Sequence, residues 1–441
     1  MRTVRTAALL AVLATLTAAA AAVPATAAVS AHGQRMHKPF VLNDPAGTAG
    51  DAFGHHVAID ASGTETIVGA QGTDAGSGEA YLYAEKNGKW SETPTERFAD
   101  PATGANHFGY SVALSPNGQT AYVGADQATV GGRAGAGAVY VYQYAHGKWP
   151  AKPTTTIGDP GKGTDNFFGV DVSVSPDGGT VVIGAPGFTA NAVDEVGEVY
   201  VYTAAHGKLP STPSANIASP TSATRGFFGY NVSVSNNASG KGALAVGAYV
   251  TSVGTVASEG AAYVFDSKSI HSWVLAKGGR LKDPGNLSDD FFGGVVTIDG
   301  AGTLVMVGAQ DETEKTVADA GAVFTYELKG GTWKLGQTLD GPANSSANFA
   351  YPAVSTNGKV ALTAAPSSTI DGHQGAGEVF TYSGNGTTYT LGATTPDPTG
   401  GSATSQDNFG NASALNSTGT VGVISAPATA GKGVVYVYAI S

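Results

Sequence analysis

Residues 168–185 decide the fold: they read Phe-Gly-Val-Asp-Val-Ser-Val, then Ser-Pro-Asp-Gly-Gly, then Thr-Val-Val-Ile-Gly-Ala. From Phe168 to Val174, bulky side chains alternate with small or polar ones, and a period of two is typical of a β-strand. Residues 175–178 favour a tight hairpin turn, because Asp and Gly tolerate the backbone angles that such turns require. The apolar run 180–185 predicts a strand covered on both faces. The segment therefore predicts a β-hairpin.

The same hairpin recurs in seven copies, spaced by 55, 60, 60, 64, 57 and 60 residues. The copies open with Phe53-Gly54, Phe108-Gly109, Phe168-Gly169, Phe228-Gly229, Phe292-Gly293, the degenerate Phe349-Ala350, and Phe409-Gly410. Val-Gly-Ala or a related triplet follows, and alternating aromatic residues such as Val199-Tyr-Val-Tyr202 form the third strand. A fourth, weaker strand is expected to begin near Trp90, Trp149, Leu209, Trp273 and Trp333. Four antiparallel strands in each of seven copies predict an all-β fold, a seven-bladed β-propeller of four-stranded antiparallel blades.

We interpret the Phe-Gly pairs as architectural residues. A glycine lets one backbone approach its neighbour closely, and a phenylalanine fills the space between two packed blades. The last copy ends at Tyr438, which leaves it without a fourth strand, whereas residues 37–45 resemble the fourth-strand endings of other copies. We therefore expect residues 35–43 to supply the outer strand of the last blade and to close the ring.

The N-terminus has the pattern of an export signal. Two positive charges, an Ala-rich apolar stretch and the small residues Ala25-Thr-Ala27 predict a signal peptide over residues 1–27. We expect residues 28–34 to be flexible and residues 35–441 to form the propeller. The Ala-rich leader indicates a bacterial source and a secreted protein, extracellular or, where the source has an outer membrane, periplasmic. No later segment is long and apolar enough to predict a membrane span.

Composition narrows the classes of function. The chain has Cys 0, which excludes disulfides, thiolate metal sites and cysteine nucleophiles. A formal charge of −11 argues against a nucleic-acid partner, because such proteins place a basic patch where the phosphates lie. We expect a monomer with no cofactor.

The repeat resembles the FG-GAP repeats of the integrin alpha-subunit propeller, in the variety found in secreted bacterial proteins. Phe-Gly followed by Val-Gly-Ala(-Pro) carries the resemblance, and Ile183-Gly-Ala-Pro186 is the fullest match. The resemblance implies extracellular adhesion or ligand recognition through the loops on one face of the disc. Integrin-type repeats often bind calcium in the first hairpin turn, but the matching turns here hold at most one carboxylate each, so we expect no metal.

The sequence offers little sign of catalysis. The nucleophile elbow, the zinc motif His-Glu-x-x-His and the P-loop are absent. The arginines after the signal peptide are scattered among the copies, and His55 and His56 are adjacent on a strand, so they point to opposite faces and cannot chelate one ion together. We interpret these histidines as isolated surface or cleft residues.

Acidic residues gather in the loops between the second and third strands. These loops lie on the same face as the connections between blades, so carboxylates from several copies could converge there and bind a ligand. An acidic, solvated rim that aids solubility is the alternative interpretation. The candidate ligand-binding residues are Asp194, Glu195, Glu259, Asp311, Glu312, Glu314 and Asp319.

Two further acidic motifs flank the connections between blades. Asp-Pro pairs, as at Asp159-Pro160, are interpreted as turn initiators. An Asp or Asn two places before the Phe, as at Asn166, is expected to tie down the same connection through its side-chain oxygen.

These observations favour a secreted, non-enzymatic recognition or adhesion module that binds a protein or a glycan through the loop face. Two alternatives stay open. One is a carbohydrate-active hydrolase or lyase that uses the central channel, and the other is an envelope scaffold without a ligand. A catalytic channel would be expected to combine two carboxylates with a histidine or an arginine, and the sequence does not assemble such a group.

Overall fold

The computed structural model describes residues 34–441 except for 191, 205–207, 222–223, 237–241, 253–255, 257, 286–287, 314–316, 318, 343–346 and 401–405. The expected signal peptide, residues 1–27, and all but the last residue of the expected flexible segment, 28–34, lie outside the described residues.

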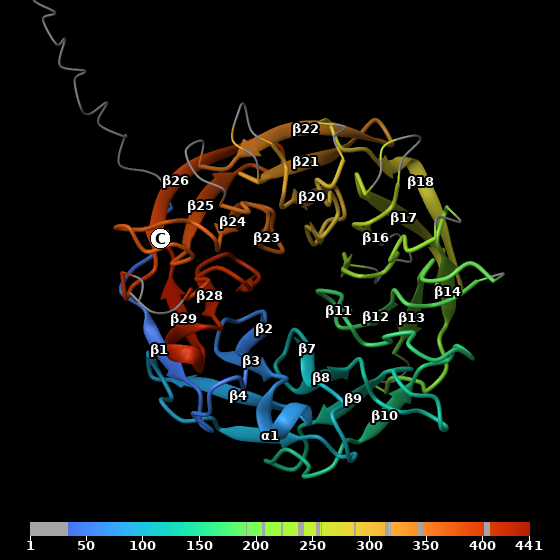
Figure 1. The fold of residues 1–441 in the computed structure, drawn as a ribbon, viewed down its shortest axis with the longest axis horizontal. Helices are drawn as coiled ribbons and strands as arrows, with labels where there is room; N and C mark the ends of the chain where they lie inside the picture. The colour runs from blue at the N-terminus through green and yellow to red at the C-terminus, as the bar shows by residue number, and fades with distance from the viewer. Residues whose placement is uncertain are drawn as a thin grey trace, which may run out of the picture. The chain divides into compact units, whose positions relative to one another are not determined.

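Seven antiparallel sheets surround a central axis (Figure 1). The seven-bladed β-propeller predicted from the repeats is therefore confirmed. From the axis outward, blade 1 comprises β2 (Phe53–Ile59), β3 (Glu65–Ala70), β4 (Glu79–Lys86), β5 (Lys89–Trp90) and β6 (Glu96–Ala99), and blade 2 comprises β7 (Phe108–Leu114), β8 (Thr120–Ala125), β9 (Ala138–Gln143) and β10 (Thr155–Gly158). Blade 3 comprises β11 (Val172–Val174), β12 (Thr180–Ala185), β13 (Glu198–Thr203) and β14 (Ala215–Ala218), and blade 4 comprises β15 (Val232–Val234), β16 (Ala243–Ala248), β17 (Ala261–Ser269) and β18 (Ser272–Leu281). Blade 5 comprises β19 (Val295–Ile298), β20 (Leu304–Ala309), β21 (Ala322–Lys329) and β22 (Thr332–Asp340); blade 6 comprises β23 (Ala353–Val354), β24 (Val360–Ala365), β25 (Glu378–Gly384) and β26 (Tyr389–Pro396); and blade 7 comprises β27 (Ser413–Leu415), β28 (Val421–Ala426), β29 (Val434–Ala439) and β1 (Phe40–Asn43). Two single turns, α1 (Thr73–Gly76) and the 3-10 turn Thr429–Gly431, lie in loops.

The N-terminal strand closes the ring as expected. β1 pairs antiparallel with β29, so that Phe40 lies opposite Val437 and Asn43 opposite Val434. The pairing extends outward, because the Arg35 backbone N–H donates to the Ser441 carbonyl at 2.9 Å. The last blade therefore takes its outer strand from the opposite end of the chain.

Strand boundaries differ from expectation at two places. In blades 3 and 4 the first strand begins at Val172 and Val232, four residues after the Phe, whereas in blades 1 and 2 it begins at the Phe itself. In blades 1 to 3 the main outer strand begins later than the predicted Trp or Leu. A proline precedes each of these strands, and proline cannot donate a hydrogen bond to the neighbouring strand.

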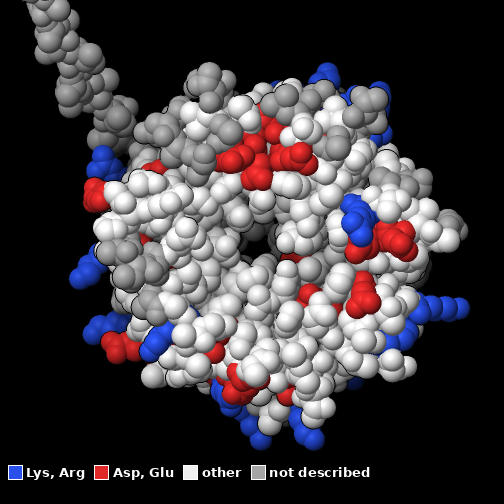
Figure 2. Space-filling view, viewed as in Figure 1, with Lys and Arg blue, Asp and Glu red and all other residues white. Residues whose placement is uncertain are grey.

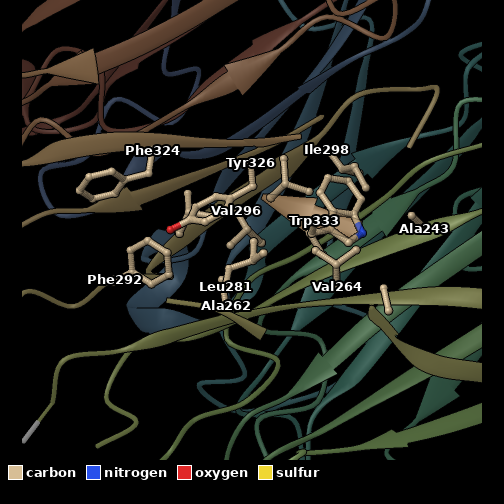
Figure 3. Packing of buried hydrophobic residues seen from close by; sticks show 14 of the residues in the cluster. Ala243, Ala262, Val264, Leu281, Phe292, Val296, Ile298, Phe324, Tyr326 and Trp333 are labelled. Atoms are coloured by element: carbon tan, nitrogen blue, oxygen red, sulfur yellow. The ribbon is translucent and has the colours of Figure 1, made fainter. Parts of the chain in front are cut away.

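The apolar core lies between blades. Figure 3 shows one such cluster, in which Phe292 and Tyr326 of blade 5 meet Leu281 and Val264 of blade 4. All seven phenylalanines of the Phe-Gly and Phe-Ala pairs are fully buried, each at 0% exposure. Their predicted architectural role agrees with this position.

Each junction between blades also brings two backbones into contact. The middle residue of the Val-Gly-Ala triplet faces the residue after the Phe in the next blade, and a Cβ added to Gly184 would lie 1.9 Å from the Gly229 carbonyl oxygen. At least one glycine is present at every junction; the facing pairs are Gly69 and Gly109, Gly124 and Gly169, Gly184 and Gly229, Gly247 and Gly293, Gly308 and Ala350, Ala364 and Gly410, and Ser425 and Gly54.

Candidate functional site

The loop face carries the connections between second and third strands and the connections between blades (Figure 2). Acidic side chains gather on this face over blade 5, and a second group lies beside basic side chains over blades 3 and 4. The predicted acids therefore do not converge on one point.

A polar pocket of about 270 Å³ lies on this face, where loops of blades 5, 6 and 7 meet. Asp311 and Asp319 come from the predicted acidic loop of blade 5. The connections into blades 6 and 7, together with the second loop of blade 6, supply the remaining lining residues, which are Asn348, Ser367, Gln374, Gly375, Gln406 and Asn408. Carboxylates accept hydrogen bonds, whereas carboxamides both donate and accept them. The lining can therefore bind a ligand that carries many hydroxyl or amine groups.

Internal hydrogen bonds hold the pocket residues in place. The Asn348 side chain donates to Asp311 Oδ1 at 2.9 Å, and its backbone N–H donates to the Asp319 carbonyl at 3.0 Å. The Asn408 backbone N–H donates to the Gly375 carbonyl at 2.8 Å. Burial and the neighbouring Asp319 raise the pKa of Asp311, and the bond from Asn348 opposes that shift. The pocket is thus a linked unit formed by three blades.

The other predicted acids lie elsewhere. Asp194 is exposed, and Glu195 forms an ion pair with Arg225, in which Oε2 and Nε are 3.2 Å apart. Glu259 is buried, and burial followed by the nearby Asp283 raises its pKa. Glu314 lies outside the described residues. These residues do not line the polar pocket.

Glu312 turns inward rather than toward solvent. It lies at the junction of blades 4 and 5 with Asp283 and Asp290, and one oxygen from each of the three buried carboxylates lies within 4.8 Å of the others. Among the described residues, this trio has the donor type that a hard cation prefers. Three oxygens are fewer than the six to eight that Ca²⁺ takes, so the trio alone does not complete a coordination shell.

At the equivalent junction, between blades 2 and 3, other groups of the protein neutralise the buried carboxylate of Asp159. Asp159 Oδ2 accepts from Arg133 Nη1 and from the Asn166 side chain, both at 2.7 Å, while its Oδ1 accepts from the Gly161 backbone N–H at 2.9 Å. The Asp-Pro aspartate thus forms a turn, and Asn166 ties down the connection through its amide group rather than through its side-chain oxygen.

Two histidines lie beside carboxylates within or next to the inner strands. His56 Nε2 lies 3.7 Å from Asp171 Oδ1, and His107 Nδ1 lies 3.3 Å from Asp126 Oδ1. His56 is therefore not isolated, whereas His55 Nδ1 lies 3.1 Å from the Tyr110 carbonyl oxygen. The partners come from different blades or loops. In the sequence, His56 and Asp171 share only one feature, because each lies three residues after the Phe of its copy, Phe53 or Phe168.

These inner residues also connect the blades. His56 Nδ1 accepts from the Val112 backbone N–H at 3.4 Å, and Asp171 Oδ2 accepts from that of Val232 at 2.7 Å. Burial lowers the pKa of His56 to about 4 and raises that of Asp171 to about 7, so burial shifts both side chains toward their neutral forms. The Val112 bond places the proton of neutral His56 on Nε2, facing Asp171.

The comparisons agree with the fold. Residues 42–83 match the family model described as FG-GAP repeat, which confirms the resemblance in the first blade. The solved structure of Kuenenia stuttgartiensis hydrazine synthase is similar, with a TM-score of 0.54 and 15% sequence identity, covering 88% of this chain and 95% of that one. At this identity the likeness concerns the fold alone. No curated protein matches the chain.

Within the described part of the chain, every helix is too short or too polar to cross a bilayer.

Proposed function

We propose that the protein is a secreted, non-enzymatic recognition module that binds a protein or a glycan through its loop face. The observation that carries this proposal is the polar pocket, because two carboxylates and four carboxamides from three blades line it. The FG-GAP repeat at residues 42–83 supports an adhesive role, and the export pattern at the N-terminus supports an extracellular or periplasmic location.

The test is a binding screen of the full chain on a glycan array and on immobilised basic peptides. The double variant Asp311→Asn/Asn408→Ala removes one charge and one amide from the pocket. We expect it to weaken binding at least about tenfold, the usual cost of removing central polar contacts. Asp194→Asn, an exposed acid of the same face outside the pocket, is the matched control and should bind normally. Binding that survives the double variant would contradict the proposal.

A second candidate is hydrolysis or elimination on a carbohydrate at the central channel. The pair His56 and Asp171 favours it, since a histidine and a carboxylate in contact are components of general acid–base catalysis. Their bonds to neighbouring blades favour a structural role instead. A panel of nitrophenyl glycosides separates the two: turnover lost in His56→Ala supports the enzyme, and no turnover supports the recognition module.

A further inference from the structure

The residue before the Phe forms a ring of seven equivalent positions on the loop face. All seven have left-handed backbone angles: φ is 55° at Ala52, 55° at His107, 54° at Phe167, 49° at Phe227, 52° at Phe291, 52° at Asn348 and 54° at Asn408. Asparagine adopts this conformation readily, whereas a bulky residue there is a genuine outlier. Blades 6 and 7 use asparagine, but blades 3 to 5 retain phenylalanine. A strained conformation that persists in three successive blades points to a function of the side chain.

Two of these phenylalanines belong to one aromatic cluster. The ring of Tyr249 lies 5.8 Å from that of Phe227, 6.0 Å from that of Phe291 and 4.4 Å from that of Tyr230, measured between centroids. All four residues are half-buried, so part of each side chain faces solvent. We call Phe227, Tyr230, Tyr249 and Phe291 the aromatic arc. Four partly exposed rings in contact form an apolar surface that can stack against a flat ligand.

The aromatic arc and the polar pocket occupy successive parts of the same ring. Phe291 belongs to blade 5, and the next two positions of the ring, Asn348 and Asn408, line the pocket. A ligand that spans the two would meet aromatic rings at one end and hydrogen-bonding groups at the other.

We propose that the arc and the pocket together bind an uncharged oligosaccharide of gluco-configured sugars. This inference rests on the proposed recognition function and names its ligand class. Such sugars carry their hydroxyl groups around the ring edge and present apolar C–H groups on both faces, which match the carboxamides and the aromatic rings. The pocket acids and the net charge of −11 disfavour an acidic glycan.

Calorimetry of the full chain with cellohexaose and with chitohexaose tests the proposal. We expect at least one to bind, and Phe227→Asn/Phe291→Asn to weaken that binding about tenfold or more, because buried aromatic contacts dominate such interfaces. Asparagine is the native residue at this position in blades 6 and 7, so the double variant should still fold. Ala52→Asn makes the same replacement at the ring position of blade 1, outside the arc, and should leave affinity unchanged.

The outcomes separate the inference from the proposed function. If a hexasaccharide binds and Asp311→Asn/Asn408→Ala weakens it but the arc variant does not, the recognition function stands and the aromatic arc is not part of the site. If deca-lysine binds at the pocket and neither sugar does, the ligand is a basic peptide and the inference is overturned. If neither sugar binds but the glycan array or the basic peptides give a signal that Asp311→Asn/Asn408→Ala removes, the recognition function stands and the inference is overturned.

Discussion

At the residue scale, the glycines of the repeat are fixed by contact between backbones. Gly184 faces Gly229 so closely that no side-chain carbon fits between them, whereas Gly88, in the hairpin turn after β4, has no atom within 4 Å of its would-be Cβ. The two positions therefore test different properties of glycine. Gly184 is required because no space exists for a Cβ, whereas Gly88 is favoured because its φ is positive.

Gly184→Ala is expected to lower the free energy of unfolding by about 3 kcal/mol or more, because its Cβ would push two blades apart. Gly88→Ala should cost only about 1 kcal/mol, the penalty for a left-handed alanine at its φ of +78°. Thermal unfolding of both variants measures the difference. Equal losses would show that the junction is not the cause.

The sequence predicted these glycines because their surroundings repeat. It did not predict Asn348, Gln374, Gln406 and Asn408, because the pocket they line exists only where loops of three blades meet. It also missed the pairing of His56 with Asp171, since these residues belong to different blades and their proximity depends on how the blades are arranged around the axis. Residues defined by the repeat were predictable, and residues defined by neighbouring loops were not.

At the element scale, one short strand completes two structures. β1 provides the outer edge of blade 7, and Leu42, at 0% exposure, packs with Phe53, Val68 and Val435 at the junction of blades 7 and 1. The sequence predicted this strand from its likeness to other fourth strands. The starts of the outer strands in blades 1 to 3 were less predictable, because a proline precedes each of them.

Leu42→Asp is expected to unfold the whole ring or to lower its unfolding temperature by more than about 5 °C, because an unpaired charge would be buried at the closing junction. Val41, the preceding residue of β1, points outward at 42% exposure, so Val41→Asp is the matched control and should change stability little. Circular dichroism melting of both variants tests the closure. A normal melt for Leu42→Asp would contradict it.

Removing the segment provides the stronger test of closure. We expect deletion of residues 28–45 to unfold the entire ring, because blade 7 would lose its outer strand and the first junction would lose Leu42. A truncated chain whose thermal transition stays within a few degrees of the full chain would show that the ring does not depend on β1.

At the scale of the whole molecule, the aspartate of the Asp-Pro pair has different partners at different junctions between blades. Between blades 1 and 2, the Asn106 side chain donates to Asp100 Oδ2 at 2.6 Å. Between blades 7 and 1, the corresponding residues are Asp44 and Asp51, and burial followed by the charge of Asp51 and a hydrogen bond to it raises the pKa of Asp44 to about 6. The ring therefore mixes amide-neutralised junctions with junctions that hold two carboxylates.

This difference predicts opposite effects of two matched substitutions. The folded-state pKa of Asp44 lies above its ordinary value of 3.8, so its protonation stabilises the fold at low pH, and that stability is lost as pH rises through about 6. Asp51→Asn should therefore stabilise the protein at pH 8, on the order of 1 kcal/mol, with the gain shrinking toward pH 5. Asn106→Asp creates a second carboxylate beside Asp100 and should destabilise most at pH 8, with recovery toward pH 5. Thermal melts of the three proteins between pH 5 and pH 8 measure both trends; parallel curves for all three would show that these pairs do not govern the pH dependence.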